Sequence, residues 1–117
     1  MAELKLYGIP NCDITKKAMS WLDKNRIKFS FHDYKQQGIS RQKLEEWIGK
    51  KGIETIFNKR STTWRELSAA EQAKATDTSG AIKLMMENTS IIKRPVIEKG
   101  EDVLVGFNEE QYNKQLK

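Results

Sequence analysis

The pattern over residues 2–34 constrains the fold of this chain more than any other feature. Apolar and polar residues alternate over 2–7, which predicts a strand, and the Gly-Ile-Pro segment at 8–10 ends it. Asn11 is able to cap a helix, and 27–34 predicts a second strand. A β-α-β unit with such short spacing favours parallel pairing of its two strands. The helix between them is expected to bury Ile14, Ala18, Trp21 and Leu22, with Cys12 in its first turn.

The middle of the chain has the periodicity of helices. Ser40 is placed to cap one helix, and Ser68 and Glu71 have the spacing of a capping box at the start of another. A further helix is expected after 79–80. The apolar residues that these patterns predict to be buried are Leu44, Trp47 and Ile48 in the first helix and Ile82, Leu84, Met85 and Met86 in the last.

The C-terminal part predicts two strands and a helix. Pro95 begins a short strand at 96–98, Lys99 and Gly100 turn the chain, and 102–106 returns as a second short strand, so this pair predicts a hairpin. Asn108 is a cap for a last helix. The order β-α-β, helical segment, β-β-α predicts an α/β fold. The buried residues of the last helix are expected to be Tyr112 and Leu116.

Composition excludes several classes of protein. With 117 residues, of which 38% are hydrophobic, the chain has the size of one domain. It is able to bury a core without disulfides or metal ions to stabilise it. No apolar run approaches the roughly 20 residues of a spanning helix, and the start lacks the apolar stretch of a signal peptide. Cys12 and His32 are the single residues of their types, which argues against an internal disulfide and a metal site. We therefore expect a protein of the reducing cytoplasm.

The net charge of +5 is mild for a protein of this length. The basic residues cluster only in pairs, which are typical of a solvated surface rather than of a nucleic-acid arm. A few cations at defined positions are better suited to bind a small anionic ligand than a nucleic acid. The pairs are Lys16-Lys17, Lys50-Lys51, Lys59-Arg60 and Lys93-Arg94.

Cys12 is the most informative single residue, because it stands between the first strand and the first helix. The thiolate is the reactive form of cysteine, and the unpaired N–H groups of a helix start favour it. The Thr15 hydroxyl and the Lys16 amine are placed to help, whereas Asp13 opposes ionisation, so we expect another cation beside the sulfur. A lone cysteine is otherwise a buried, small apolar residue. The loop at 8–11 argues against burial.

Two further segments offer polar groups for a site. Arg94 precedes Pro95, which favours an extended backbone, and its fork of donors suits a carboxylate or oxyanion beside Cys12. The segment 58–65 is rich in donors and lies between two helical patterns. For both segments the alternative is an ordinary exposed surface.

Three segments occur in a specific order along the chain: Tyr7–Asp13, Phe57–Trp64 and Ile92–Val96, followed by Val105–Phe107. Together they resemble the arsenate reductase-like family that includes ArsC and Spx, and above all its small YffB-type branch. The resemblance extends over nearly the whole chain.

The resemblance implies a fold and a set of site residues. The fold is thioredoxin-like, a single domain over 1–117 with a mixed four-stranded sheet and a helical insertion at approximately 38–90. Cys12 would be the catalytic nucleophile, and Pro95 would be the cis-proline that faces it. Arg60 and Arg94 would be the partners of an oxyanion or of the thiolate. The full set of expected supporting residues is Asn11, Thr15, Lys16, Arg60, Arg94 and Pro95.

The chain departs from the family pattern at two places. Position 15 is Thr15, so the Cys-x-x-Cys switch of the redox-sensing regulators is missing. The third arginine of the arsenate reductases is replaced around Gly106-Phe107. With these two departures, the family chemistry that remains uses a single cysteine. A mixed disulfide needs an attacking thiolate and a resolving thiol, so the second thiol would come from another molecule.

We therefore expect a bacterial, cytoplasmic enzyme, a thiol-dependent oxidoreductase with no bound cofactor. Its cosubstrate would be glutathione or a similar low-molecular-weight thiol, and its substrate an oxidised protein or small molecule. We expect a monomer with no membrane or nucleic-acid partner. The alternatives are an arsenate reductase and a non-enzymatic, Spx-like regulator that binds RNA polymerase.

Overall fold

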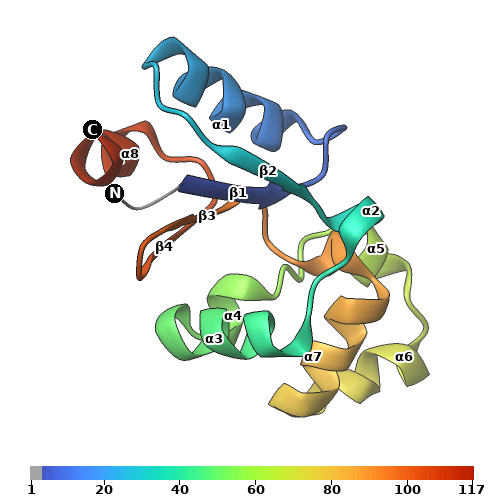
Figure 1. The fold of residues 1–117 in the computed structure, drawn as a ribbon. Coiled ribbons are helices and arrows are strands. Elements are labelled where there is room, and N and C mark those ends of the chain that lie inside the picture. The colour runs from blue at the N-terminus through green and yellow to red at the C-terminus, as the bar shows by residue number, and fades with distance from the viewer. Residues whose placement is uncertain (1–3) are drawn as a thin grey trace. The chain divides into compact units, whose positions relative to one another are not determined.

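The computed structural model describes residues 4–117, which divide into two compact units (Figure 1). The first unit contains the chain up to Tyr34 together with Arg94–Lys117, and the second contains Lys35–Lys93. The second unit corresponds in sequence to the helical segment expected at approximately 38–90.

The first unit is built on a mixed four-stranded sheet with the strand order β2-β1-β3-β4. Strand β1 pairs in parallel with β2 and antiparallel with β3, and β3 pairs antiparallel with β4. This confirms the predicted α/β class, the parallel β-α-β unit and the hairpin. Residues 2 and 3 of the expected first strand lie outside the described residues. The strands are β1 (Leu4–Gly8), β2 (Ser30–Asp33), β3 (Val96–Lys99) and β4 (Asp102–Val105).

Two helices of this unit, α1 (Asp13–Lys24) and α8 (Glu109–Leu116), cover one face of the sheet (Figure 1). Helix α8 begins as predicted, because the Asn108 side chain accepts a hydrogen bond from the Gln111 N–H. The arrangement of a β-α-β half and a β-β-α half around this sheet is thioredoxin-like. The shared core contains Leu4, Leu6, Ala18, Trp21, Leu22, Ile97, Leu104, Tyr112 and Leu116.

The buried face of α1 differs from the prediction by one residue. Ile14 is 48% exposed, whereas Thr15 is completely buried. Both residues fit the helical spacing with Ala18 and Leu22, so periodicity alone does not separate them. The sheet determines which of the two residues is buried, because Gly8 at the end of β1 has no side chain. An added Cβ there would lie only 2.8 Å from Thr15 Oγ1, so the space that Thr15 fills exists because residue 8 is glycine.

The second unit consists of short helices around its own apolar core. Helix α3 packs against α4 and α7, and α5 lies against the 3₁₀ helix η2. The elements after β2 are α2 (Tyr34–Gln37), α3 (Arg41–Lys51), α4 (Ile53–Ile56), α5 (Thr62–Glu66), α6 (Ala69–Ala73), η1 (Lys74–Thr76), α7 (Thr78–Glu87) and η2 (Thr89–Ile91). The largest fully buried residues include Leu44, Trp47, Ile56, Ile82, Leu84, Met85, Ile91 and Ile92.

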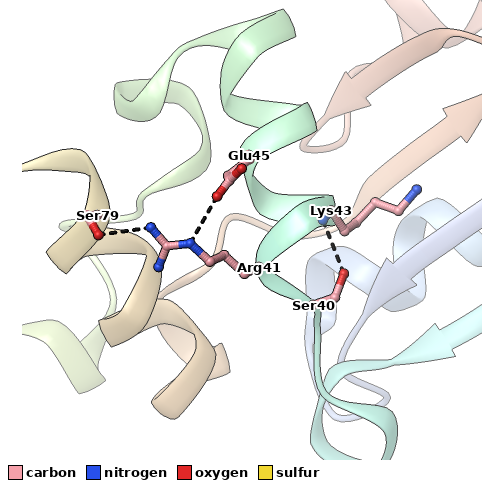
Figure 2. A network of polar contacts seen from close by, with 5 residues as sticks. All are labelled: Ser40, Arg41, Lys43, Glu45 and Ser79. Atoms are coloured by element: carbon pink, nitrogen blue, oxygen red, sulfur yellow. Dashed lines mark hydrogen bonds and ion pairs between the residues drawn. The ribbon is translucent and has the colours of Figure 1, made fainter.

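Side-chain hydrogen bonds begin α3 and join it to α7 (Figure 2). Ser40 Oγ accepts a hydrogen bond of 3.1 Å from the Lys43 N–H, which confirms the predicted cap. The Arg41 guanidinium donates to Glu45 one turn along α3 at 2.9 Å and to Ser79 Oγ on α7 at 2.8 Å. Because these groups are exposed, we expect the contacts to orient the helices more than to stabilise them.

Two details of the helical segment correct the prediction. Helix α7 begins at Thr78, before the Ser79-Gly80 pair, because the Asp77 carboxylate accepts a hydrogen bond of 2.7 Å from the Gly80 N–H and caps it. Met86, expected in the core, is 40% exposed, while Met85 is buried. The predicted cap at Ser68 is confirmed, since its Oγ accepts from the Glu71 N–H at 3.2 Å. No helix within residues 4–117 is both long and apolar enough to cross a membrane.

Candidate active site

Cys12 lies directly before α1 and occupies the N-cap position itself. Its N–H donates to the Ile9 carbonyl at 3.1 Å, and its own carbonyl accepts from the Lys16 N–H at 2.9 Å. Asn11, expected to be the cap, is exposed in the turn before it. At an N-cap the side chain faces the free N–H groups of the first helical turn, so the sulfur takes the place usually held by a hydroxyl or carboxylate oxygen.

Arg94 supplies the cation beside the sulfur. Its Nε donates a hydrogen bond of 3.3 Å to Cys12 Sγ, although 82 positions separate the two residues in the sequence. Sheet register brings them together, because Tyr7 near the end of β1 pairs with Val96 at the start of β3. The Arg94–Pro95 peptide bond is cis. The Pro95 carbonyl accepts a hydrogen bond of 2.8 Å from the Gly106 N–H, which ties this loop to the end of β4.

These surroundings lower the pKa of the Cys12 thiol from 9.0 to about 7. Partial burial acts in the opposite direction and raises the pKa, since it removes water from the thiolate. The hydrogen bond and the charge of Arg94, together with the N–H and the hydroxyl of Thr15, outweigh it. A pKa near neutrality gives a large thiolate fraction at cellular pH, which is typical of reactive rather than structural cysteines.

Thr15 contributes a buried hydroxyl that makes no hydrogen bond in the structure. The same hydroxyl favours the ionised form of Cys12 and is one cause of its lowered pKa. The charge of the sulfur accounts for both observations, because a thiolate accepts hydrogen bonds far better than a thiol does, and a hydroxyl hydrogen rotates to suit its partner. We therefore expect the Thr15 hydroxyl to donate to the sulfur when Cys12 is ionised.

Gly8 supports this arrangement, and the sequence analysis did not identify it. We expect Gly8→Ala to displace Thr15, which would raise the pKa of Cys12 and destabilise the protein by about 1–3 kcal/mol. Thiolate absorbance against pH and denaturant unfolding measure the two effects. Gly49→Ala is the matched control, because an added Cβ at Gly49 meets nothing within 4 Å. A titration identical to that of the unsubstituted protein would show that Thr15 does not need this space.

The remaining predicted site residues lie in different surroundings. Lys16 is exposed on α1 and lines a cavity with Trp21 and Phe107, and it is not among the groups that change the pKa of Cys12. Arg60 belongs to the second unit, where the Asn58 side chain accepts a hydrogen bond of 3.1 Å from its N–H. The first unit therefore brings Thr15 and Arg94 to Cys12, and Pro95 follows Arg94 through the cis peptide bond.

Phe107 lies in the segment where the third arginine of the arsenate reductases is replaced. Its ring lies edge-on to that of Tyr112 with the centroids 5.2 Å apart, and it packs against the core of the first unit. The Tyr112 hydroxyl donates to the Gly106 carbonyl at 2.6 Å. Position 107 itself is thus an apolar contact, and the cations that line a cavity with Phe107 are the lysines Lys16, Lys17 and Lys24 rather than an arginine.

Several known proteins are similar to this chain in sequence and fold. A solved structure of a YFFB protein is 44% identical, has a TM-score of 0.92 and matches over 97% of this chain and 99% of that one. An uncharacterised protein of Haemophilus influenzae is 41% identical over 110 residues, 93% of this chain and 95% of its own length. The global transcriptional regulator Spx of Streptococcus agalactiae is 28% identical over 110 residues, 92% of this chain and 79% of its own. The model of the ArsC family matches residues 7–115, and the chain therefore belongs to the ArsC family.

Proposed function

We propose that the protein is a thiol-dependent reductase in which Cys12 forms a mixed disulfide that glutathione, or a similar low-molecular-weight thiol, resolves. The observation that supports this proposal most is the Arg94 Nε hydrogen bond of 3.3 Å to Cys12 Sγ. It accompanies a pKa of about 7 for this thiol, so that about half of the molecules carry a thiolate at neutral pH. The thiolate is the form that attacks a disulfide.

The proposed reaction proceeds by thiol–disulfide exchange. The Cys12 thiolate attacks one sulfur of the oxidised substrate, the substrate's disulfide bond breaks, and the other substrate sulfur leaves as a thiolate that takes a proton from water. A first glutathione thiolate then attacks the Cys12 sulfur and releases the second substrate thiol. A second glutathione attacks the resulting Cys12–glutathione disulfide, forms oxidised glutathione and regenerates the Cys12 thiolate. Two glutathione molecules are oxidised for each substrate disulfide reduced.

Arg94 has two proposed roles in this cycle. It stabilises the thiolate before attack and again after the last exchange, when the negative charge returns to the sulfur. While Cys12 is held in a mixed disulfide, the sulfur carries no charge, and the proposed second role of the guanidinium is to donate to a carboxylate of glutathione. Arg60 is proposed as a further carboxylate ligand on the basis of the family motif. A monomer in a reducing cytoplasm, where glutathione is abundant, suits this chemistry.

The direct test is the reaction of the protein with oxidised glutathione at several pH values. We expect one glutathionyl group per chain by mass spectrometry, and a rate that rises with pH, reaches half its maximum near pH 7 and is flat above about pH 8. The rate follows the thiolate fraction, which increases as the pH passes upward through the lowered pKa of Cys12. Cys12→Ser is the control without a thiol. A midpoint near 9, the ordinary value, would contradict the proposal.

A second candidate function, a non-enzymatic regulator, is supported by the similarity to Spx over most of the chain. In that case a surface binds a large protein partner, such as RNA polymerase, and the thiol is not needed for the contact. A pull-down with purified RNA polymerase separates the two functions. Binding that Cys12→Ser retains would favour the regulator, and no binding together with glutathionylation would favour the reductase.

A further inference from the structure

The second unit contains a cavity of about 660 Å³ whose lining residues all lie between Ile53 and Lys93. This volume is within the range of small-molecule sites, roughly 300–1,000 Å³. Its walls combine two kinds of residue. Ile53, Phe57 and Ala81 are apolar, whereas Lys59, Arg60 and Lys93 are cationic. A mixture of apolar wall and convergent polar groups is typical of ligand sites.

The charge of the lining is unbalanced. Among residues 4–117, no carboxylate forms an ion pair with Lys59, Arg60 or Lys93. Glu54 also lines the cavity, so three cations face one acidic residue there. The excess of positive charge in the lining gives the cavity a positive potential, which favours an anion over a neutral ligand. The guanidinium fork of Arg60 suits the planar or tetrahedral oxygens of a carboxylate or phosphate.

Backbone hydrogen bonds hold the cationic side of the cavity in place. An isolated antiparallel bridge pairs Phe57 with Ile92. The Asn58 N–H donates to the Ile91 carbonyl and the Lys93 N–H donates to the Ile56 carbonyl, each at 2.8 Å. The loop that carries Lys59 and Arg60 is therefore fixed to the segment that carries Lys93. The side chains of Lys59 and Arg60 are exposed and that of Lys93 is half-buried, so these bonds fix the backbone positions of the three cations, and part of the ordering cost is met before a ligand binds.

We propose that this cavity binds a small organic anion. Its apolar part would lie against Ile53, Phe57 and Ala81, and its carboxylate or phosphate would contact Lys59, Arg60 and Lys93. The site goes beyond the proposed reductase function, because two of its three cations have no role in thiol exchange and its binding does not need the Cys12 sulfur. Arg60 is the one residue that the two proposals share.

The test uses the full-length Cys12→Ser protein, in which thiol chemistry is absent, so that failure of this proposal is distinct from failure of the reductase. We would titrate ¹⁵N-labelled protein with 4-phenylbutyrate, with its uncharged amide and with inorganic phosphate, and follow backbone amide shifts. With phenylbutyrate we expect saturable shifts centred on Phe57–Arg60 and Lys93. The amide lacks the negative charge and inorganic phosphate lacks the apolar group, so each should bind at least about tenfold more weakly.

Charge variants in the same background locate the site. Lys59→Glu is expected to weaken phenylbutyrate binding by about tenfold or more, and Lys93→Gln, which keeps most of the apolar stem, by severalfold. Lys83→Glu is the matched control, because Lys83 is exposed on α7 and does not line the cavity. Equal weakening by Lys59→Glu and Lys83→Glu would indicate only a general charge effect and overturn the proposal. Shifts confined to other residues, or none at all, would overturn it as well.

Discussion

At matched concentrations, we expect the protein to form a Cys12–glutathione disulfide readily while arsenate reduction stays near background. Arsenate is a compact tetrahedral oxyanion, and one or two arginines only partly neutralise its charge. Arg94 is the cation bound to Cys12, and position 107 holds an aromatic ring packed on Tyr112 rather than an arginine. Glutathione has separated carboxylates, so single cations suffice for each.

Parallel assays measure this difference. Arsenite production is followed with glutathione as reductant, and the glutathionylated protein is quantified by mass spectrometry in the absence of arsenate. Cys12→Ser sets the background of both assays. Robust, Cys12-dependent arsenate reduction without glutathionylation would reverse the ranking of the two enzymes, and it would show that the missing arginine near Phe107 is irrelevant.

Charge reversal at Arg94 is expected to produce the largest change in the thiol itself. Arg94→Glu replaces a hydrogen-bonding cation with an anion, which should move the midpoint of the Cys12 titration from about 7 to 9 or above. At pH 7 the thiolate fraction would then fall from about one half to about 1% or less. The rate of disulfide exchange should fall less, because nucleophilicity rises with thiol pKa (Brønsted coefficient about 0.4–0.5).

Thiolate absorbance against pH measures this shift directly. Arg94→Met keeps much of the side-chain stem and removes the charge, so an intermediate midpoint is expected. Arg26→Met is the control for loss of an arginine within the same unit, since Arg26 is not among the groups that affect the pKa of Cys12. An unchanged midpoint in Arg94→Glu would show that the guanidinium does not lie beside the sulfur in solution.

The strands and several helix starts of this protein could be predicted from short segments of sequence. Ser40, Ser68 and Asn108 each accept a hydrogen bond from the N–H three residues further along the chain. Such caps depend on neighbouring residues only, so the local sequence contains the information. The parallel β1–β2 pair and the hairpin followed from alternation and from the lengths of the connections. The position of Cys12 between a strand and a helix followed in the same way.

The chemistry around Cys12 depended on tertiary structure. Helical periodicity is compatible with burial of either Ile14 or Thr15. Thr15 is the buried one because Gly8 has no side chain to occupy the same space. The family resemblance suggested Arg94 as a partner, but the Nε contact with the sulfur arises from the antiparallel pairing of β1 with β3. Local sequence thus determined where strands and helices begin and that one cysteine stands at a helix start. Only long-range packing decided which donors reach its sulfur, because the shift in the thiol pKa depends on distances between residues far apart in the chain.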